Sequence, residues 1–410
     1  MLVKLFYKNT TFSREFQRDV NLFFLHYIAT RSVLVYTIMV LFFLEFGLSF
    51  AAIMVLSVVE SISSLVFSIP VGLLADRWNK KKVVMLGKIL SIVGFLTYII
   101  HPSFYMFLIA EILLSIGNTC ISSADTSFLY SKFKQNKHEE IYKNFIAFRN
   151  SKLFIVGAFA TILATIIYSI NIFLPFILSS MVLILSTFFL LKIKDETESC
   201  VIPIENNKKT VKLQLKKSIE SIQNNKVLRD LTILNGLFIV IIANISYVSS
   251  AYLQELGMEI VYMGVFFFLS SMVASYASKK SIFLYEKYKS KFYHTLLIFL
   301  SLSFILMSIR NLFLIAIIII LTRLMSALIM PALSATINLH IDDENRTTTL
   351  SMIGFLQSLL TVLIDPAIGL LMDITSMSTA FLYVGIVFTV MSIIYIKQLT
   401  NSTFAINKNV

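Results

Sequence analysis

Long apolar segments that alternate with short charged turns constrain this chain more than any other feature. The turn Asp76-Arg77-Trp78-Asn79-Lys80-Lys81-Lys82 shows the pattern most sharply, because apolar runs flank it closely on both sides. A helix needs about 20 apolar residues to cross the hydrocarbon, whereas transmembrane strands would alternate every second residue. The apolar runs are therefore predicted to be membrane-spanning helices, and the chain leaves the membrane at this turn only to re-enter it at once.

The composition agrees with an all-α integral membrane protein. Of the 410 residues, 57% are hydrophobic and only 14% are charged. A soluble domain is about 45–50% apolar and about 25% charged. A surplus this large cannot be buried in a water-soluble core, so most of it must face lipid.

Twelve spanning helices are predicted, six in each half of the chain. The expected spans are residues 20–44, 50–74, 82–100, 104–130, 145–169, 172–191, 231–253, 259–281, 293–309, 312–339, 347–371 and 378–397. They divide the chain into a six-helix bundle over 1–191, a basic cytoplasmic linker over 192–230, and a second six-helix bundle over 231–410. Within the linker, Val211, Leu215, Ile219 and Ile222 recur at helical spacing, which predicts an amphipathic helix on the inner membrane surface.

The charge distribution predicts the orientation of the chain. The formal net charge is +12, and the basic residues gather in every second turn between the apolar segments. Lys and Arg hold loops on the cytoplasmic side, so both termini are expected in the cytoplasm. Because the charge is confined to loops, it indicates topology rather than nucleic-acid binding.

The two halves of the chain also look like repeats. A shift of 210 residues places Gly47 on Gly257, Ser61 on Ser271, and Asp76-Arg77-Trp78 on Glu286-Lys287-Tyr288. An acid, a base and an aromatic residue therefore recur at the same point of each half. Together with the central basic linker, this favours two parallel repeats.

The charged turn resembles the loop between helices 2 and 3 of major facilitator transporters, whose pattern is G-x-L-A-D-R-x-G-R-K. The sequence keeps Gly72, the Leu-Ala-Asp-Arg run and the basic pair, with Asn79 at the usual glycine. The segments Gly47-Leu48-Ser49 and Ile69-Pro70-Val71-Gly72 resemble a bacterial branch with unassigned or multidrug substrates. The resemblance implies two six-helix bundles related by a pseudo-two-fold axis.

The resemblance also implies a cytoplasmic gate at this turn. In the family the aspartate sits at the inner end of segment two and bonds toward segment eleven when the cytoplasmic side is closed. The alternative is that these charges only hold the loop in the cytoplasm. The residues expected at the gate are Gly72, Asp76, Arg77, Lys80 and Arg346.

Several ionisable residues fall inside the predicted spans. A charge at the centre of a spanning helix costs about 2.5–3.5 kcal/mol on insertion scales, so it tends to mark a pathway or a pair. They are expected to line a central cavity that binds substrate or carries a proton. Alternatively, Arg31 pairs with Glu60 or Glu111, and Arg323 with Asp365, which would fix helix register. The pathway residues are Arg31, Glu60, Glu111, Arg323 and Asp365.

Two further features lie near the inner ends of the spans. Asp125 is expected to form a charge pair with Arg149, or with Lys152, and otherwise to meet headgroup water. His26 and His101 could titrate near neutral pH. A lone histidine at a helix surface or turn is, however, more often without such a role.

These features favour a secondary active transporter that moves a small molecule by alternating access across a bacterial cytoplasmic membrane. Coupling to a proton or another ion is expected, with Glu60 as the first choice of titrating group, and export is favoured over uptake on resemblance alone. We expect a monomer in the lipid bilayer, without cofactor or metal. No G-x-x-x-x-G-K-[ST] nucleotide motif occurs. The alternatives are a permease subunit driven by a separate ATPase and an integral membrane enzyme.

Overall fold

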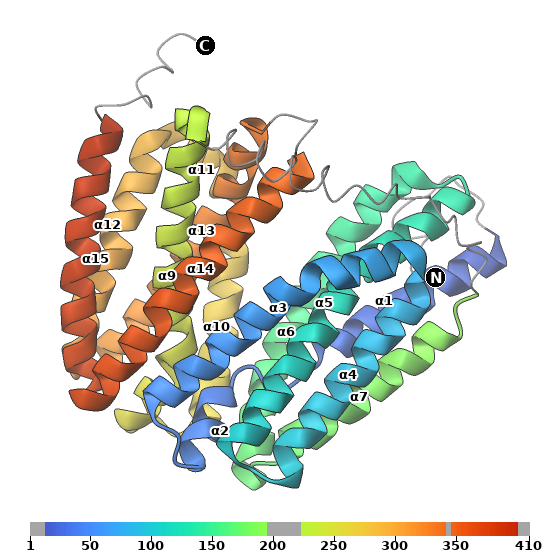
Figure 1. Ribbon diagram of the computed structural model, residues 1–410, viewed down its shortest axis with the longest axis horizontal. Helices are drawn as coiled ribbons and strands as arrows, with labels where there is room; N and C mark the ends of the chain where they lie inside the picture. Colours follow the sequence, from blue (N-terminus) through green and yellow to red (C-terminus); the bar gives the residue numbers. More distant parts are fainter. Residues whose placement is uncertain (1–12, 195–222, 342–345, 401–410) are drawn as a thin grey trace. The chain divides into compact units, whose positions relative to one another are not determined.

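The computed structural model describes residues 13–194, 223–341 and 346–400, and the regular elements in those residues are helices joined by short turns (Figure 1). The chain forms two compact units. Unit 1 comprises Met1–Leu48 and Val59–Ile204, and unit 2 comprises Ser49–Val58 and Glu205–Val410.

The helices follow the predicted spans closely. They are α1 (Arg14–Arg31), α2 (Met39–Glu45), α3 (Phe50–Arg77), α4 (Lys80–Ile100), α5 (Phe104–Gln135), α6 (Glu139–Ile170), α7 (Leu174–Leu191), α9 (Lys226–Glu255), α10 (Ile260–Ser278), α11 (Ser281–Tyr288), α12 (Ser290–Met307), α13 (Leu312–Leu339), α14 (Arg346–Ile374) and α15 (Met377–Thr400). The expected linker helix falls in residues 195–222, which lie outside the described residues.

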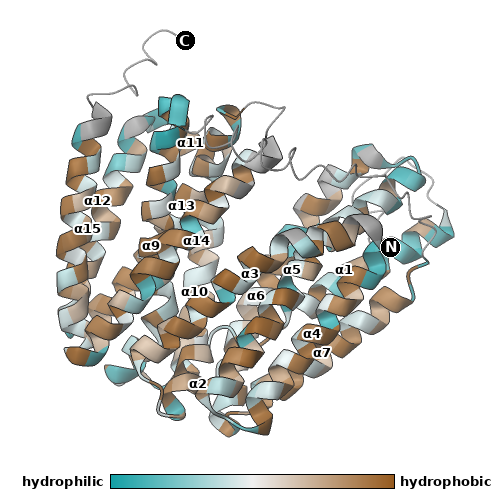
Figure 2. Ribbon diagram, viewed as in Figure 1, coloured by the Kyte–Doolittle hydropathy of each residue, from teal (hydrophilic) through white to brown (hydrophobic). Residues whose placement is uncertain are grey.

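In the described part of the chain, ten helices are long and apolar enough to cross a membrane. A bent pair, Ser281–Tyr288 with Lys291–Met307, would count as an eleventh span. Figure 2 shows that hydrophobic residues dominate the lengths of these helices, with hydrophilic residues more frequent near their ends. Many large apolar side chains are exposed along them, among them Phe154, Leu163 and Ile394. A lipid environment accounts for such apolar exteriors, which a water-soluble protein would bury.

The first expected span, residues 20–44, is not one continuous helix. Helix α1 ends at Arg31, α2 starts at Met39, and residues 32–38 between them are not helical. The apolar side chains of Val35 and Ile38 in the break are fully enclosed. The amide of Leu34, freed from helical bonding, donates to the Ser179 hydroxyl on α7 at 3.0 Å. Irregular backbone at membrane depth is tolerated only where protein or water satisfies it, and here α7 does so.

Close helix packing in unit 1 depends on small residues where α4 crosses α5. A methyl group added at Gly117 would lie 2.5 Å from the Ser91 hydroxyl and 2.7 Å from the carbonyl oxygen of Gly87. One added at Gly87 would lie 2.6 Å from the carbonyl oxygen of Gly117. Small residues at such crossings let two helix backbones approach without a side chain between them.

The predicted repeats share a turn conformation. Gly47 has φ +73° and Gly257 has φ +91°, and both follow a helix C-terminus. At each end, the glycine amide bonds the carbonyl three residues earlier, and the next amide bonds the carbonyl five residues earlier. This is the Schellman arrangement, in which glycine takes the left-handed conformation at low cost. The two positions matched by the 210-residue shift are thus alike in backbone geometry.

In unit 2, a carboxylate from the end of α14 caps the start of α3. The two oxygens of Asp373 accept from the amides of Phe50 at 2.7 Å and Ala51 at 2.8 Å. Gly369, one turn earlier on α14, lies close enough to the Phe50 carbonyl that a methyl group would meet it at 2.7 Å. A carboxylate at this position satisfies free amides and complements the helix dipole.

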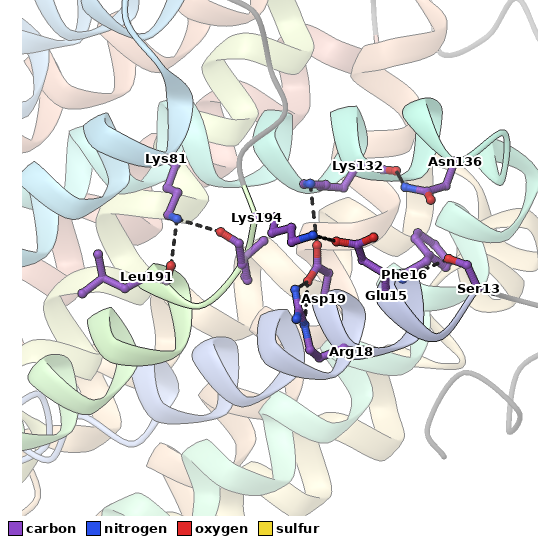
Figure 3. Close-up of polar contacts among 11 residues, drawn as sticks. Ser13, Glu15, Phe16, Arg18, Asp19, Lys81, Lys132, Asn136, Leu191 and Lys194 are labelled. Carbon is purple, nitrogen blue, oxygen red and sulfur yellow. Dashed lines mark hydrogen bonds and ion pairs between the residues drawn. The ribbon is translucent and has the colours of Figure 1, made fainter.

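Polar contacts join several elements at the N-terminal end of α1 in unit 1 (Figure 3). Lys132 on α5 lies 3.6 Å from the carboxylate of Asp19, and both side chains are buried. Lys81 donates to the carbonyl oxygens of Leu191 at 2.9 Å and Ile193 at 2.7 Å, where α7 ends. A lysine of the charged turn therefore caps a helix C-terminus, in addition to any role in topology.

At the same end of unit 1 lies an ion pair in which both side chains are exposed. Glu15 lies 2.5 Å from the Lys194 ammonium group (Figure 3). The hydrogen bond and the charge of Lys194 lower the pKa of the Glu15 carboxyl. Since the folded pKa is depressed, any stabilisation from this pair is present above the unfolded pKa and is lost as pH falls through the folded value. Exposure to solvent keeps its contribution small.

Candidate functional site

A pair of carboxyl groups forms the most unusual feature of unit 1. Glu111 on α5 is buried, 6% exposed, and accepts a hydrogen bond of 2.6 Å from the Tyr98 hydroxyl. Glu60 on α3 is exposed and close enough to Glu111 for their charges to interact. The Ser115 hydroxyl, one turn after Glu111, donates to the backbone carbonyl oxygen of Glu60 at 2.7 Å. This hydrogen bond links α5 to α3.

Neither carboxyl group of this pair has a cationic partner within ion-pair distance among the residues that the structure describes. Ionised side chains inside a membrane protein normally pair with an opposite charge or face water, because burying a lone charge is costly. A carboxyl group can avoid this cost by binding a proton. The pair can therefore act as a proton acceptor or as an anionic contact for a substrate.

The break between α1 and α2 places two more polar side chains on the same unit. Arg31 closes α1, and its guanidinium group packs over Gly157 on α6, where a methyl group would meet Nε at 2.8 Å. Tyr36 lies within the break and is 66% exposed. Its hydroxyl faces the Asn118 amide and lies within electrostatic range of Arg31, Glu60 and Glu111. The break thus directs a phenol toward the carboxyl pair.

The two charged candidate residues of unit 2, Arg323 and Asp365, have different contacts. Arg323 on α13 lies over the ring of Phe267, 4.7 Å from its centroid, with Ser271 on α10 at 3.4 Å from Nη1. Asp365 on α14 is buried and accepts a hydrogen bond of 2.9 Å from the Asn244 amide on α9. Asp365 therefore pairs with an amide rather than with Arg323.

The internal repeat places candidate residues of the two units at nearly equivalent sequence positions. Under the 210-residue shift, Ser271 corresponds to Ser61, next to Glu60, and Arg323 falls two residues after the equivalent of Glu111. In unit 1 the carboxyl pair lies on α3 and α5, and in unit 2 Ser271 and Arg323 lie on α10 and α13. The corresponding two helices of each repeat therefore carry the candidate groups, which are two acids in unit 1 and a serine and an arginine in unit 2.

The structure pairs the other internal charges differently from the sequence prediction. The Asp125 carboxylate faces His26, with 3.4 Å between Oδ1 and Nε2, and does not pair with Arg149. The Arg149 guanidinium instead stacks over Tyr27, 4.4 Å from the ring centroid, and donates to Asn150. The charge pair predicted between Asp125 and Arg149 is thus wrong, because an aromatic ring takes up the guanidinium and a histidine takes up the carboxylate.

The residues of the predicted gate are described only in part. Lys80 donates to the Ser131 hydroxyl on α5 at 3.1 Å, and Gly72 has open space where a side chain would project. Asp76, Arg77 and Arg346 lie in helices, but their side chains are outside the described part of the structure. Their role in a gate stays a prediction.

A buried lysine was missed by the reading of the sequence. Lys88 on α4 is fully enclosed, and its ammonium group lies between the Thr30 and Ser186 hydroxyls. The signal was present, because Lys88 is the only charged residue within the apolar run from Val83 to Ile100.

Among the described residues, no group of three or more His, Cys, Asp or Glu side chains could hold a metal ion.

Comparison with solved structures identifies the fold. A point variant of the nucleoside transporter NupG superposes with a TM-score of 0.74 at 13% identity, covering 94% of this chain and 99% of that chain. A bacterial homologue of the human lysosomal transporter Spinster, in an inward-facing and unoccupied conformation, gives 0.67 at 14% identity, covering 93% and 95%. A variant of the peptide transporter POT in complex with alafosfalin gives 0.67 at 14% identity, covering 94% of each chain.

Sequence comparison identifies the family. No curated protein sequence matches this chain. The family model of the Major Facilitator Superfamily matches residues 21–291, well over half of the chain. That range includes the charged turn at Asp76 and both members of the carboxyl pair, Glu60 and Glu111. The expected transporter fold is thereby confirmed, and the chain belongs to the major facilitator superfamily of membrane transporters.

Proposed function

We propose that this transporter couples the movement of a small molecule to the movement of a proton, and that the carboxyl pair Glu60–Glu111 binds the proton. The observation that carries the proposal is the environment of Glu111. This carboxyl group is buried against a tyrosine hydroxyl, it has a second carboxyl group nearby, and the described residues supply no cation to it. Binding a proton removes the charge that is costly at this depth.

The substrate would contact the exposed members of the same cluster. Glu60, Tyr36 and Arg31 are exposed and offer an acid, a phenol and a base on one face of unit 1. In unit 2, Arg323 and Asp365 are the candidates, since both are charged side chains at membrane depth. In this proposal Glu60 contacts both the proton and the substrate. Binding of the proton therefore changes the affinity for the substrate, and binding of the substrate changes the affinity for the proton.

We infer export from the cytoplasm across a bacterial cell membrane, with both termini in the cytoplasm. The inference of direction depends on resemblance to a branch with multidrug substrates, and the inference of orientation on the basic turns. The similar solved structures include nucleoside and peptide transporters, so polar substrates also belong in any test.

The test is flux through the purified chain alone in sealed vesicles, with and without a pH gradient and without ATP. The probes are ethidium, uridine, dialanine and glucose, one of each chemical class. We expect at least one probe to accumulate in response to the pH gradient and to stop when an uncoupler collapses it. A probe flux that is the same with and without the pH gradient would contradict proton coupling. Flux that needs a separate ATPase would contradict secondary transport altogether.

A further inference from the structure

A second group of ionisable side chains is buried in unit 1, apart from the carboxyl pair. Lys88 on α4 and His26 on α1 are both fully enclosed, and Asp125 on α5 is 6% exposed. Asp125 and Glu111 lie on the same helix, 14 residues apart, which is about 21 Å at about 1.5 Å per residue. The group thus lies along α5 at a different depth from Glu111.

Hydrogen-bond directions can be assigned at the lysine end of this group. An ammonium group only donates, so the Thr30 hydroxyl and the Ser186 hydroxyl, at 3.1 Å, accept from Lys88. The Thr30 hydroxyl then donates to the carbonyl oxygen of His26 at 2.8 Å. The Ser186 hydroxyl has two acceptors within reach, which are His26 Nδ1 at 2.9 Å and the His26 carbonyl oxygen at 3.1 Å.

At the other end of the group, two buried polar atoms face each other. His26 Nε2 and Asp125 Oδ1 face each other at 3.4 Å, and both are buried without a hydrogen-bond partner. A proton on Nε2 would be held by the carboxylate, because a neutral imidazole donates from one nitrogen and accepts at the other. When Ser186 donates to Nδ1, the proton must reside on Nε2, facing Asp125. The group then forms a chain of hydrogen bonds in which Lys88 donates to Ser186, Ser186 to His26, and His26 to Asp125.

One hydroxyl rotation lets the same group accept a second proton on the imidazole. If the Ser186 hydroxyl turns to the His26 carbonyl oxygen, its oxygen still accepts from Lys88 and can also accept from a protonated Nδ1. The Ser186 carbonyl oxygen, 3.4 Å from Nδ1, is a further acceptor. Both charge states of His26 therefore have their hydrogen bonds available without movement of a helix.

Charged and polar groups from several helices surround His26. Besides Lys88 and Asp125, the Tyr27 ring lies 5.1 Å from the imidazole, and Arg149 on α6 stacks on that ring. Farther along α1, Asp19 pairs with Lys132 on α5. Helix α7 contributes the Ser186 hydroxyl. The anion that faces His26 directly is Asp125, so the carboxylate can hold an imidazolium in place.

We propose that His26, held between Ser186 and Asp125, is a second proton-binding site of this transporter, and that its protonation state acts on the break in α1. The contacts of α7 support the connection. Ser186 bonds His26, and Ser179, two turns earlier on the same helix, holds the Leu34 amide inside the break. Thr30, which bonds Lys88, directly precedes Arg31 at the end of α1. A change in the hydrogen bonds of Thr30 thus occurs beside the segment that carries Arg31 and Tyr36. A change at Ser186 occurs on the helix that holds this segment through Ser179.

Nitrogen NMR of the purified chain with ¹⁵N-labelled histidine tests the site itself without any substrate. The chain has five histidines, and His26→Gln identifies the signal of His26 by its loss. At alkaline pH we expect the proton on Nε2, and on acidification we expect a second proton on Nδ1. Ser186→Ala should move the neutral form toward the Nδ1–H tautomer, because Nδ1 loses its donor. His101→Gln, in an exposed turn, should leave the His26 signal unchanged.

A transport measurement then tests the action on the α1 break, and this part depends on the proposed transport function. With any probe that the wild type moves, His26→Gln should remove the change in flux between about pH 5 and pH 8, and His101→Gln should retain it. An Nδ1–H tautomer at alkaline pH, or an imidazole that keeps one charge state over this range, overturns the proton site. A confirmed titration with unchanged pH dependence in His26→Gln overturns only the link to transport. If no probe is moved by the wild type, the proposed function fails and the NMR result still decides on the proton site.

Discussion

Glu111→Gln should abolish the accumulation that a pH gradient drives while leaving exchange of the substrate across the vesicle membrane intact. Glutamine keeps an oxygen that accepts from the Tyr98 hydroxyl, but it cannot bind and release a proton. One pH unit corresponds to about 1.4 kcal/mol, or about a tenfold concentration ratio for one coupled proton. Under a gradient of one pH unit, the wild type should approach that ratio, and the variant should give a ratio of about one.

Exchange in the absence of a gradient separates loss of coupling from loss of fold. A labelled probe inside the vesicles and the same unlabelled probe outside should still exchange through Glu111→Gln. Glu259→Gln is the matched control, because it makes the same chemical change at an exposed N-cap residue whose side chain forms no capping hydrogen bond. Normal accumulation by Glu111→Gln would remove this residue from the proton pathway. Loss of both exchange and accumulation in a variant that unfolds at the wild-type temperature would assign the residue to substrate binding instead.

Gly117→Val should cause a large loss of stability in unit 1. Its Cβ would lie 2.5 Å from the Ser91 hydroxyl and 2.7 Å from the Gly87 carbonyl oxygen, and the second of these belongs to the backbone of the facing helix. Overpacking typically costs about 1–3 kcal/mol, and more where backbone must move. We expect a lower thermal unfolding midpoint in detergent, or loss of folded protein from the membrane.

Two further variants decide whether close approach is the cause. Gly354→Val is the control, because a methyl group there meets nothing within 4 Å, although valine is also placed in a helix. Gly117→Ala, which adds only the methyl group, should already lower the midpoint, and by less than valine does. Equal midpoints for Gly117→Val and Gly354→Val would show that helix propensity, and not the α4–α5 crossing, sets the cost.

The spanning helices were predictable because their signal is local. Hydropathy and charge placed helix α13 at Leu312–Leu339, where it is observed, and the charged turn separated α3 from α4. The pairing of Gly47 with Gly257 was also visible, and the structure gives both a left-handed conformation. Such features depend on residues near in sequence, or on a comparison of the chain with itself.

The break in α1 and the partners of the buried charges were not predictable in this way. Residues 32–38 are mostly apolar, so hydropathy continues through them, and the break depends on a hydroxyl from Ser179 far along the chain. Asp125 has candidate cations at Arg149 and Lys152, yet it faces His26. The choice depends on the rotation of each helix about its axis, which long-range packing decides and a single sequence does not record.

The most direct test of the account is to measure protons that move because substrate moves. Vesicles containing the purified chain and a trapped pH-sensitive dye start with no pH gradient, and a probe that the chain transports is then added on one side. We predict that the wild type changes the internal pH as the probe crosses, and that Glu111→Gln moves the probe with no change in pH. Probe flux through the wild type without any proton movement would contradict the proposal that Glu60 and Glu111 make this protein a proton-coupled transporter.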